Sequence, residues 1–518
     1  MYEAKYSKYV TQNTTRFAEC EEVIAVSSKV DKSKRNKPCG VPLFYNKHNA
    51  PYVDDGDNHT AVIGPSGCKK SRTVVFPLVS SIIEAGESAV INDPKGEIYL
   101  NTANAAYQKG SDVFVLNLRT LNGHCWNPLS VIYDYYYSGD EDTAFALTND
   151  FVECIVNPSI EKTVDRYWGD SSKYMLNGDT LSLLDSVNDK RYFNISNVIQ
   201  FCNEGNVNKL KIIHKCMDPN SIAALCYNSS LNLQAEKTRS CIFSTLQACL
   251  EPFIKNPKLT KMLSASSFDM ENLGKKQTII YIIYPDEKTT YNFIVNMFLT
   301  QAYEILVRLA SASANDRLPV RVNFVLDEFA NLPKIDNFEN RISEARSKNI
   351  RYILCLQSFN QLESKYGKNA ETIISNCNNW ICFSSKEMSF LNKIAEICGK
   401  EVDYNGTEHY LLTPSEMQQL KKEEEYAEAL VIKQGLYPFV TELADFDYIP
   451  QFKTSKAKMP ERFKNAEYGK LISFNEWFSF VETDVFRSPF KKIKTRSEKQ
   501  DLDKELEAKL DELFGNAS

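Results

Sequence analysis

The first part of the chain alternates short apolar runs with segments of helical periodicity. Apolar, β-prone runs at 60–63, 88–92 and 112–116 bracket two segments that we expect to be helical, an apolar one at 73–79 and a second at 99–109. Strands that alternate with helices in this way are joined by right-handed crossovers and form a parallel sheet covered on both faces. The pattern predicts an α/β domain with a doubly wound, mostly parallel sheet.

Between residues 138 and 263 the strand signals fade and helical periodicity dominates. We expect an all-α domain inserted into the sheet domain. Its predicted helices cover 141–155, 172–184, 195–202, 221–233 and 238–252.

The strand pattern then resumes with QTIIYIIY at 277–284. A nearly continuous apolar run of this kind is typical of a strand buried on both faces. Further strands are expected at 320–328, 351–356, 380–383 and 429–433, with helices at 290–310 and 335–348.

The two ends of the chain are polar. We expect a polar N-terminal arm (1–50), a sheet domain formed by 51–137 and 264–450, and a charged C-terminal tail (451–518). The tail contains a basic run at 491–494 and a helix over 498–514. A solvated segment is a better interpretation of the basic run than a nucleic-acid contact, although the latter stays open.

Composition limits the class of protein. The 518 residues include 43% hydrophobic and 25% charged residues, enough for two to four folded domains, and the net charge of −6 gives no general argument for nucleic-acid binding. The 14 cysteines form no CxxC pair, which favours reduced thiols in the cytosol over a zinc site. We see no signal peptide and no apolar run as long as a membrane helix, so we expect no transmembrane segment in this chain.

The most informative stretch is HTAVIGPSGCKKS at 59–71. It places a strand, a turn-rich loop and a helix in the order of the phosphate-loop pattern G-x-x-x-x-G-K-[ST]. In such a loop the backbone N–H groups bind a polyphosphate, the lysine reaches the β- and γ-phosphates, and the hydroxyl binds Mg²⁺. The predicted nucleotide-binding residues are Gly64, Pro65, Ser66, Gly67, Cys68, Lys69, Lys70 and Ser71.

One position departs from the pattern, because Lys69 stands where the second glycine is expected. If the loop requires a positive φ there, a lysine costs about 1–2 kcal/mol that a glycine would not. Its extra positive charge could also attract phosphate. A strand-to-helix loop without a ligand is the alternative interpretation.

An acidic pair at the end of a later strand supports the phosphate-loop interpretation. The apolar strand VRVNFVL ends in Asp327 and Glu328. The aspartate would hold Mg²⁺ together with Ser71, and the glutamate would orient or deprotonate the attacking water. The next predicted strand ends in Gln357, whose amide could sense the γ-phosphate. Arg341 and Arg346 lie on the intervening helix.

These segments together resemble the conjugative coupling proteins of type IV secretion systems, the TraG/VirD family, in the form found in Gram-positive mobile elements. The likeness covers roughly residues 55–450. It rests on HTAVIGPSGCKKS, AGESAVINDPKGEIY, NLR…WNPL, IIYPDEKTTYNFIVNMFLTQ, VLDEFANLP and ILCLQSFNQLESKYG.

The resemblance implies a RecA-like P-loop NTPase fold, with ATP and Mg²⁺ as cofactors. Family members form hexameric rings at the inner face of the membrane, bind DNA with little sequence preference and couple a relaxase–DNA complex to the secretion channel. By the same likeness, Arg346 matches an arginine that acts across the subunit interface, beside Glu328 and Gln357 as catalytic residues. Asp93 to Glu97 would belong to the motor core near the nucleotide.

Two departures from the family leave alternatives open. Because of Lys69, the alternative to a DNA-transferring ATPase is a non-hydrolysing adaptor that only recruits substrate to the channel. The family usually begins with membrane helices, so we expect either a cytoplasmic protein docked by a membrane-protein partner, a shortened start or a soluble homologue.

Overall fold

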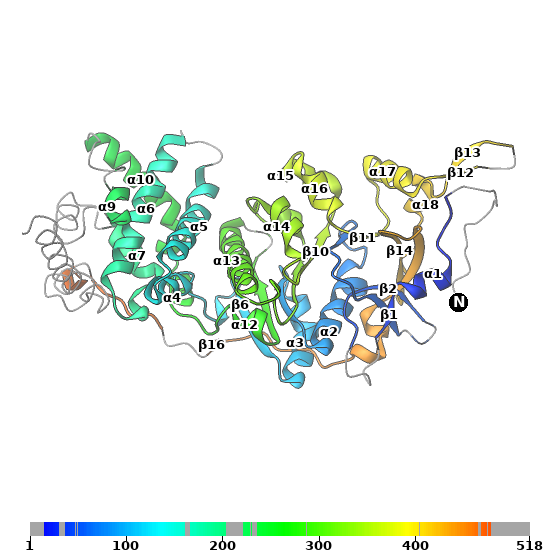
Figure 1. Ribbon diagram of the computed structural model, residues 1–518, viewed down its shortest axis with the longest axis horizontal. Coiled ribbons are helices and arrows are strands. Elements are labelled where there is room, and N and C mark those ends of the chain that lie inside the picture. Colours follow the sequence, from blue (N-terminus) through cyan, green and yellow to red (C-terminus); the bar gives the residue numbers. More distant parts are fainter. Residues whose placement is uncertain are drawn as a thin grey trace, which may run out of the picture. The chain divides into compact units, whose positions relative to one another are not determined.

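The computed structural model describes residues 15–30, 37–46, 48, 50–160, 166–203, 221–227, 229, 236–285, 287, 289–402, 405–464, 468–473 and 475–477. The chain divides into two compact units (Figure 1). Unit 1 comprises residues 1–124 and 268–464, and unit 2 comprises residues 125–267 and 465–518.

Unit 1 is built on an eleven-stranded sheet in the order β15-β14-β11-β4-β10-β9-β5-β8-β6-β7-β16. The run from β11 to β6 is entirely parallel, while β14, β15 and β7 pair antiparallel. The strands are β4 (Thr60–Ile63), β5 (Ser88–Asn92), β6 (Asp112–Asn117), β7 (Asn122–His124), β8 (Thr278–Ile283), β9 (Val322–Leu326), β10 (Ile350–Leu356), β11 (Asn379–Cys382), β14 (Tyr426–Lys433), β15 (Phe439–Ala444) and β16 (Phe463–Lys464). This is the predicted doubly wound, mostly parallel sheet.

Helices cover both faces of the sheet because the order in which the chain adds strands to the sheet reverses after β6. From β4 through β6 the connections step one way along the sheet, and from β8 through β11 they step back. Right-handed crossovers then place α2 and α3 on one face and α13 to α16 on the other (Figure 1). These helices are α2 (Phe76–Ala85), α3 (Glu97–Lys109), α13 (Asn292–Ser311), α14 (Phe338–Ala345), α15 (Phe359–Tyr366) and α16 (Asn369–Ser375).

The central strands are apolar throughout because both of their faces are buried. Every residue of β5, β8, β9 and β10 is buried. Helix α13 is long and apolar enough to cross a membrane, but 78% of its most apolar window is buried inside the protein, as in a core helix. It is the one such helix among the described residues.

The N-terminal region differs from the polar arm expected for residues 1–50. Its described part contains helix α1 (Cys20–Ala25) and the strands β1 (Ser28–Lys29) and β2 (Val41–Tyr45). These strands form a three-stranded sheet with β3 (Pro51–Asp54), in the order β1-β3-β2. A few apolar residues, among them Val30, Val41 and Leu43, are buried in the core of unit 1. The polar average over residues 1–50 hid them because the apolar stretches are short, as in VPLFY at 41–45.

The expected C-terminal tail also begins later than residue 451. The segment up to Lys464 runs along α3, where Ala457 N donates to Leu100 O (2.8 Å), and it ends in β16, which pairs with β7. Single backbone contacts of this kind leave no periodic signal in the sequence. The basic run at 491–494 and the helix predicted at 498–514 lie outside the described residues.

Unit 2 is helical, and it begins earlier than the insertion boundary expected at residue 138. Helix α6 contacts α5, α7, α9 and α10. The helices of unit 2 are α4 (Ser130–Ser138), α5 (Glu141–Ile160), α6 (Arg166–Ser186), α7 (Ile195–Asn203), α9 (Ile222–Tyr227), α10 (Glu236–Ile254) and α11 (Pro257–Met262). Trp477, from the C-terminal part of this unit, packs edge-on against Phe201, with ring centroids 4.5 Å apart.

The remaining short elements of unit 1 lie between the main strands. They are the helices α12 (Asn272–Lys275), α17 (Met388–Cys398) and α18 (Pro414–Gln418), and the hairpin of β12 (Lys400–Val402) and β13 (Glu408–Tyr410).

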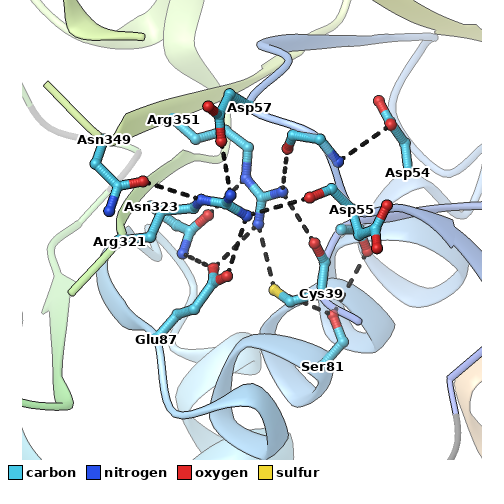
Figure 2. Close-up of polar contacts among 12 residues, drawn as sticks. Cys39, Asp54, Asp55, Asp57, Ser81, Glu87, Arg321, Asn323, Asn349 and Arg351 are labelled. Atoms are coloured by element: carbon cyan, nitrogen blue, oxygen red, sulfur yellow. Dashed lines mark hydrogen bonds and ion pairs between the residues drawn. The ribbon is translucent and has the colours of Figure 1, made fainter. Parts of the chain in front are cut away.

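A buried ionic network closes the amino edge of the parallel strands (Figure 2). Arg351, on β10, donates to Asn323 Oδ1 (2.7 Å), to the carbonyl oxygens of Cys39 (3.0 Å) and Gly56 (3.1 Å), and to Glu87 Oε2 (3.3 Å). These contacts attach the N-terminal segment to the sheet.

Candidate nucleotide site

The loop from Gly64 to Lys70 connects β4 to a helix whose first turn, η1 (Ser71–Val75), is π-helical. Gly64 N donates to Leu356 O (3.1 Å), which fixes the start of the loop beside the end of β10. A Cβ at Gly64 would lie 2.7 Å from Cys68 Sγ and 2.8 Å from Phe383 Cβ. The first glycine of the pattern is therefore required by close packing.

Lys69 has the backbone conformation of the glycine that it replaces. Its φ is 73°, so the loop does place this residue in the left-handed region. A lysine in this region costs about 1–2 kcal/mol relative to a glycine. Its side chain turns toward the end of β15, where Nζ lies 2.9 Å from Asp445 Oδ2 and 2.6 Å from Glu424 O.

Lys70 is buried and its ammonium faces the loop. Nζ donates to the carbonyl oxygens of Gly64 and Pro65, at 3.1 Å from the latter. Both acceptors belong to the segment that a phosphate-binding loop wraps around its ligand. The lysine is thus already inside the loop, where it could reach an anion.

Ser71 connects the loop to the acidic strand. Its Oγ donates to Asp327 Oδ2 (3.3 Å), and Asp327 directly follows β9. Burial raises the pKa of Asp327, an effect that the charge of Lys70 opposes. A hydroxyl and a carboxylate oxygen at this separation are hard oxygen ligands of the type that Mg²⁺ prefers, so the two residues fit a shared cation.

Glu328 lies in a strained backbone position beside Asp327. Its φ is 53°, and its carboxylate accepts from Asn331 Nδ2 (2.8 Å) and lies 3.6 Å from Lys95 Nζ. Left-handed φ values at non-glycine residues concentrate at functional sites. Lys95, from the loop after β5, is a contact that the sequence did not predict.

Asp93 directly follows β5, the strand next to β9, and its carboxylate binds a backbone N–H group of the helix that comes next. It accepts from Tyr99 N (2.8 Å) at the start of α3. Burial raises the pKa of Asp93 to about 7. Its neighbour Asn92 donates from Nδ2 to Asp327 O (2.6 Å) and so supports the acidic strand. The sequence placed this turn at the correct edge of the sheet.

Gln357 and Arg346 have different positions in the fold. Gln357 follows β10, which pairs with β4 on one side and β9 on the other, so it lies at the same edge as the loop. Arg346 caps the C-terminal end of α14 and is exposed. It precedes β10, whose seven residues span about 23 Å. Within one chain, Arg346 is not part of the site.

Asp445 is a further residue near the loop that the sequence did not predict. It accepts from Lys69 and also from Arg72 Nε (2.8 Å), although it is separated from these residues by more than 370 positions. Burial alone would raise the pKa of Asp445, but the hydrogen bonds from Arg72 and Lys69 bring it below its usual value. No local pattern could indicate this contact.

The family model described as Type IV secretory system Conjugative DNA transfer matches residues 16–469. A conjugal transfer protein TraG of Escherichia coli is 25% identical over 372 residues, which are 65% of this chain and 53% of TraG. Protein VirD4 of Rhizobium radiobacter is 22% identical over 390 residues, or 68% and 50%. The chain thus spans about half the length of the curated relatives it matches.

The solved structures that resemble the chain have the same fold. The bacterial conjugative coupling protein TrwB, crystallised with sulphate, covers 89% of this chain and 99% of its own with a TM-score of 0.60 at 14% identity. A TrwB complex with a non-hydrolysable ATP analogue gives the same values, and a complex with ADP and Mg²⁺ has a TM-score of 0.57 at 13% identity over 86% and 96%. This likeness shows the RecA-like P-loop fold.

Proposed function

The chain belongs to the family of type IV secretory system conjugative DNA transfer proteins, and we propose that it is a coupling protein that binds and hydrolyses ATP to drive DNA transfer. One observation carries the proposal: Ser71 Oγ donates to Asp327 Oδ2 (3.3 Å), which brings the phosphate loop and the acidic strand together. A loop without a ligand would not require a carboxylate there.

The phosphate loop would bind the nucleotide. Backbone N–H groups of residues 64–71 would hold the phosphates, with the N-terminal end of the following helix behind them. Lys70 would leave the carbonyl oxygens of Gly64 and Pro65 to reach the β- and γ-phosphates. Ser71 and Asp327 would hold Mg²⁺, which would supply positive charge to neutralise the phosphates.

The acidic edge would perform the hydrolysis. Glu328 would accept a proton from the attacking water, and Gln357 at the end of β10 would contact the γ-phosphate. Arg346 lies at the other end of β10. It would therefore stabilise phosphoryl charge in the loop of the next subunit of a ring.

The partners follow from the family and from the names of the relatives. TraG is a conjugal transfer protein, and the family model describes DNA transfer by a type IV secretory system. We propose a homo-hexamer that binds DNA through its backbone in a salt-dependent way. It would recruit a relaxase–DNA complex to the channel proteins at the inner face of the membrane, with a membrane protein as a further partner.

A non-hydrolysing adaptor is the second candidate, and Lys69 is the observation that favours it. The lysine keeps a φ of 73° where a glycine would relax the loop. An adaptor would retain the fold and the partner surfaces, and would use the helical unit to recruit the relaxase without turnover.

Lys70→Ala separates the two candidates. We expect Mg²⁺-ATP affinity, measured by calorimetry, to fall about 10- to 100-fold, because a charge-assisted hydrogen bond to phosphate is lost. DNA transfer from cells that depend on this chain should fall with it. The matched control is Lys109→Ala, at a surface ion pair with Glu84 (2.9 Å), which should change neither quantity. Transfer that survives Lys70→Ala would favour the adaptor.

A further inference from the structure

A buried carboxylate connects the phosphate loop to the antiparallel edge of the sheet. Asp445 directly follows β15, and its side chain is 2% exposed. It accepts from Lys69 Nζ (2.9 Å) and from Arg72 Nε (2.8 Å) and Nη2 (2.5 Å). One carboxylate therefore holds two cations that lie on either side of Lys70 and Ser71.

The contact of Lys69 explains how a lysine occupies the glycine position. The residue has a φ of 73°, which an L-residue adopts reluctantly. Its ammonium is held by Asp445 and by the carbonyl oxygen of Glu424 (2.6 Å), and only 15% of its side chain is exposed. The side chain is thus directed out of the loop, toward β15, while Lys70 faces the loop interior.

We propose that Asp445 is a positioning residue for the phosphate loop: by binding the Lys69 ammonium it stabilises a glycine-like backbone and keeps a second cation out of the phosphate position. The inference rests on the proposed function of the loop in nucleotide binding. It assigns to Lys69 and Asp445 together the task that the second glycine performs alone in the usual pattern.

The neighbouring Asp447 provides a natural contrast. It also pairs with Arg72 (2.5 Å), but its side chain is 69% exposed and no contact to Lys69 accompanies it. If negative charge near the loop were the only requirement, substitutions of Asp445 and Asp447 would have similar effects on nucleotide affinity. If positioning of Lys69 matters, only Asp445 should affect nucleotide binding.

Two substitutions at Lys69 test the mechanism without removing Asp445, which keeps Arg72 as a partner. Lys69→Gly needs no support for a positive φ, so its Mg²⁺-ATP affinity should stay within about threefold of the parent. Lys69→Met keeps the Cβ and the chain length but loses the ammonium. Its affinity should fall about tenfold, since the left-handed conformation is no longer held. Equal affinities of the Gly and Met variants would overturn the proposal.

Asp445→Asn completes the test, with Asp447→Asn as its control. The Asp445 variant should bind Mg²⁺-ATP about tenfold more weakly, and adding Lys69→Gly should restore most of the affinity. A loss that Lys69→Gly does not restore would mean that Asp445 acts only on stability or through Arg72, and would contradict the proposal. Asp447→Asn should bind like the parent.

Hydrogen exchange of the loop amides, measured without nucleotide, tests the positioning role of Asp445 separately from the proposed nucleotide binding. Lys69→Met and Asp445→Asn should accelerate exchange over residues 67–71, and Lys69→Gly in the Asp445→Asn background should reverse the change. Unchanged exchange in both variants would refute the positioning role. If exchange behaves as expected but the parent does not bind Mg²⁺-ATP, the positioning holds and the nucleotide function fails.

Discussion

Basic side chains lie at both the amino and the carboxyl edge of the central sheet, but their surroundings differ. At the amino edge, Arg351 is buried and donates to several fixed partners, including Asn323 (2.7 Å) and Glu87 (3.3 Å) (Figure 2). At the carboxyl edge, Lys70 donates to carbonyl oxygens of its own loop, and Glu328 lies 3.6 Å from the half-exposed Lys95.

The backbone shows the same contrast. One left-handed residue at the amino edge is Asn349 (φ 67°), a residue type that tolerates this region, and its side chain accepts from Arg321 (3.4 Å). At the carboxyl edge, Lys69 (φ 73°) and Glu328 (φ 53°) are left-handed, although neither is a residue type that favours this region. The amino edge is closed by buried contacts, whereas the carboxyl edge has left-handed backbone at Lys69 and Glu328 and carries the residues that we propose bind the nucleotide.

Arg351→Met should break the amino edge with the largest effect on stability. It leaves the carbonyl oxygens of Cys39 and Gly56 without their donor and removes the buried guanidinium beside Glu87, which keeps Asn323 and Arg321 as donors. We expect a cost of about 3–5 kcal/mol. Hydrogen exchange at the amides of β9 and β10 would measure the loss. Nucleotide affinity of the folded protein should not change.

The matched control for Arg351 is Arg317→Met. Arg317 is 43% exposed and pairs with Asp57 (3.0 Å), so its loss should cost less than about 1 kcal/mol. Equal losses of stability in the two variants would mean that the buried contacts of Arg351 stabilise the fold no more than the exposed ion pair of Arg317.

His59 makes the amino edge sensitive to acid. Its Nδ1 accepts from Tyr352 N (2.9 Å), and its Nε2 lies 2.9 Å from Ile342 O, an arrangement that fits the neutral ring. Burial lowers the pKa of His59 to about 4. The unfolded chain takes up the proton first, so stability is present above pH 6.5 and is lost as the pH falls toward 4.

The expected loss at His59 between pH 7 and 4.5 is about 2–3 kcal/mol. Urea unfolding of the parent and of His59→Gln at both pH values would measure it. The variant should be less stable at pH 7 and should depend less on pH. A pH dependence equal to that of the parent would show that His59 does not control acid sensitivity.

Lys95→Ala should have the smallest effect, at the carboxyl edge. The contact with Glu328 is long and half-exposed, so stability should change by less than about 1 kcal/mol. ATP turnover should change about two- to fivefold, because the orientation of Glu328 relaxes while Asn331 still holds it. Lys276→Ala, which removes a surface pair with Asp112 (2.6 Å), should leave turnover unchanged. Identical turnover in both variants would remove Lys95 from the site.

The sequence predicted what depends on periodicity. Strands β4 and β5 have the expected bounds, and the alternation of strands and helices gave the doubly wound sheet. The phosphate loop and the Asp327–Glu328 pair follow strands that pattern alone could place. Their meeting followed from the rule that parallel strands share a carboxyl edge.

The sequence could not predict contacts between distant single residues. Asp445 is 376 positions from Lys69, and a lone aspartate after a strand is usually a turn residue. Arg351 is the second residue of β10, where a charged side chain is usually solvated, and only the structure shows Glu87 and Asn323 beside it. Neither contact repeats with a period, so only the folded chain shows it.

The most direct test of the proposed ATPase is steady-state ATP hydrolysis with and without DNA, for the parent, Glu328→Gln and Lys69→Gly. We predict DNA-stimulated turnover that Glu328→Gln lowers at least about 100-fold, since a general base is lost, while Mg²⁺-ATP still binds. Lys69→Gly should hydrolyse ATP about as fast as the parent. A parent that binds Mg²⁺-ATP without turnover, particularly if Lys69→Gly restores it, would contradict the account and favour the adaptor.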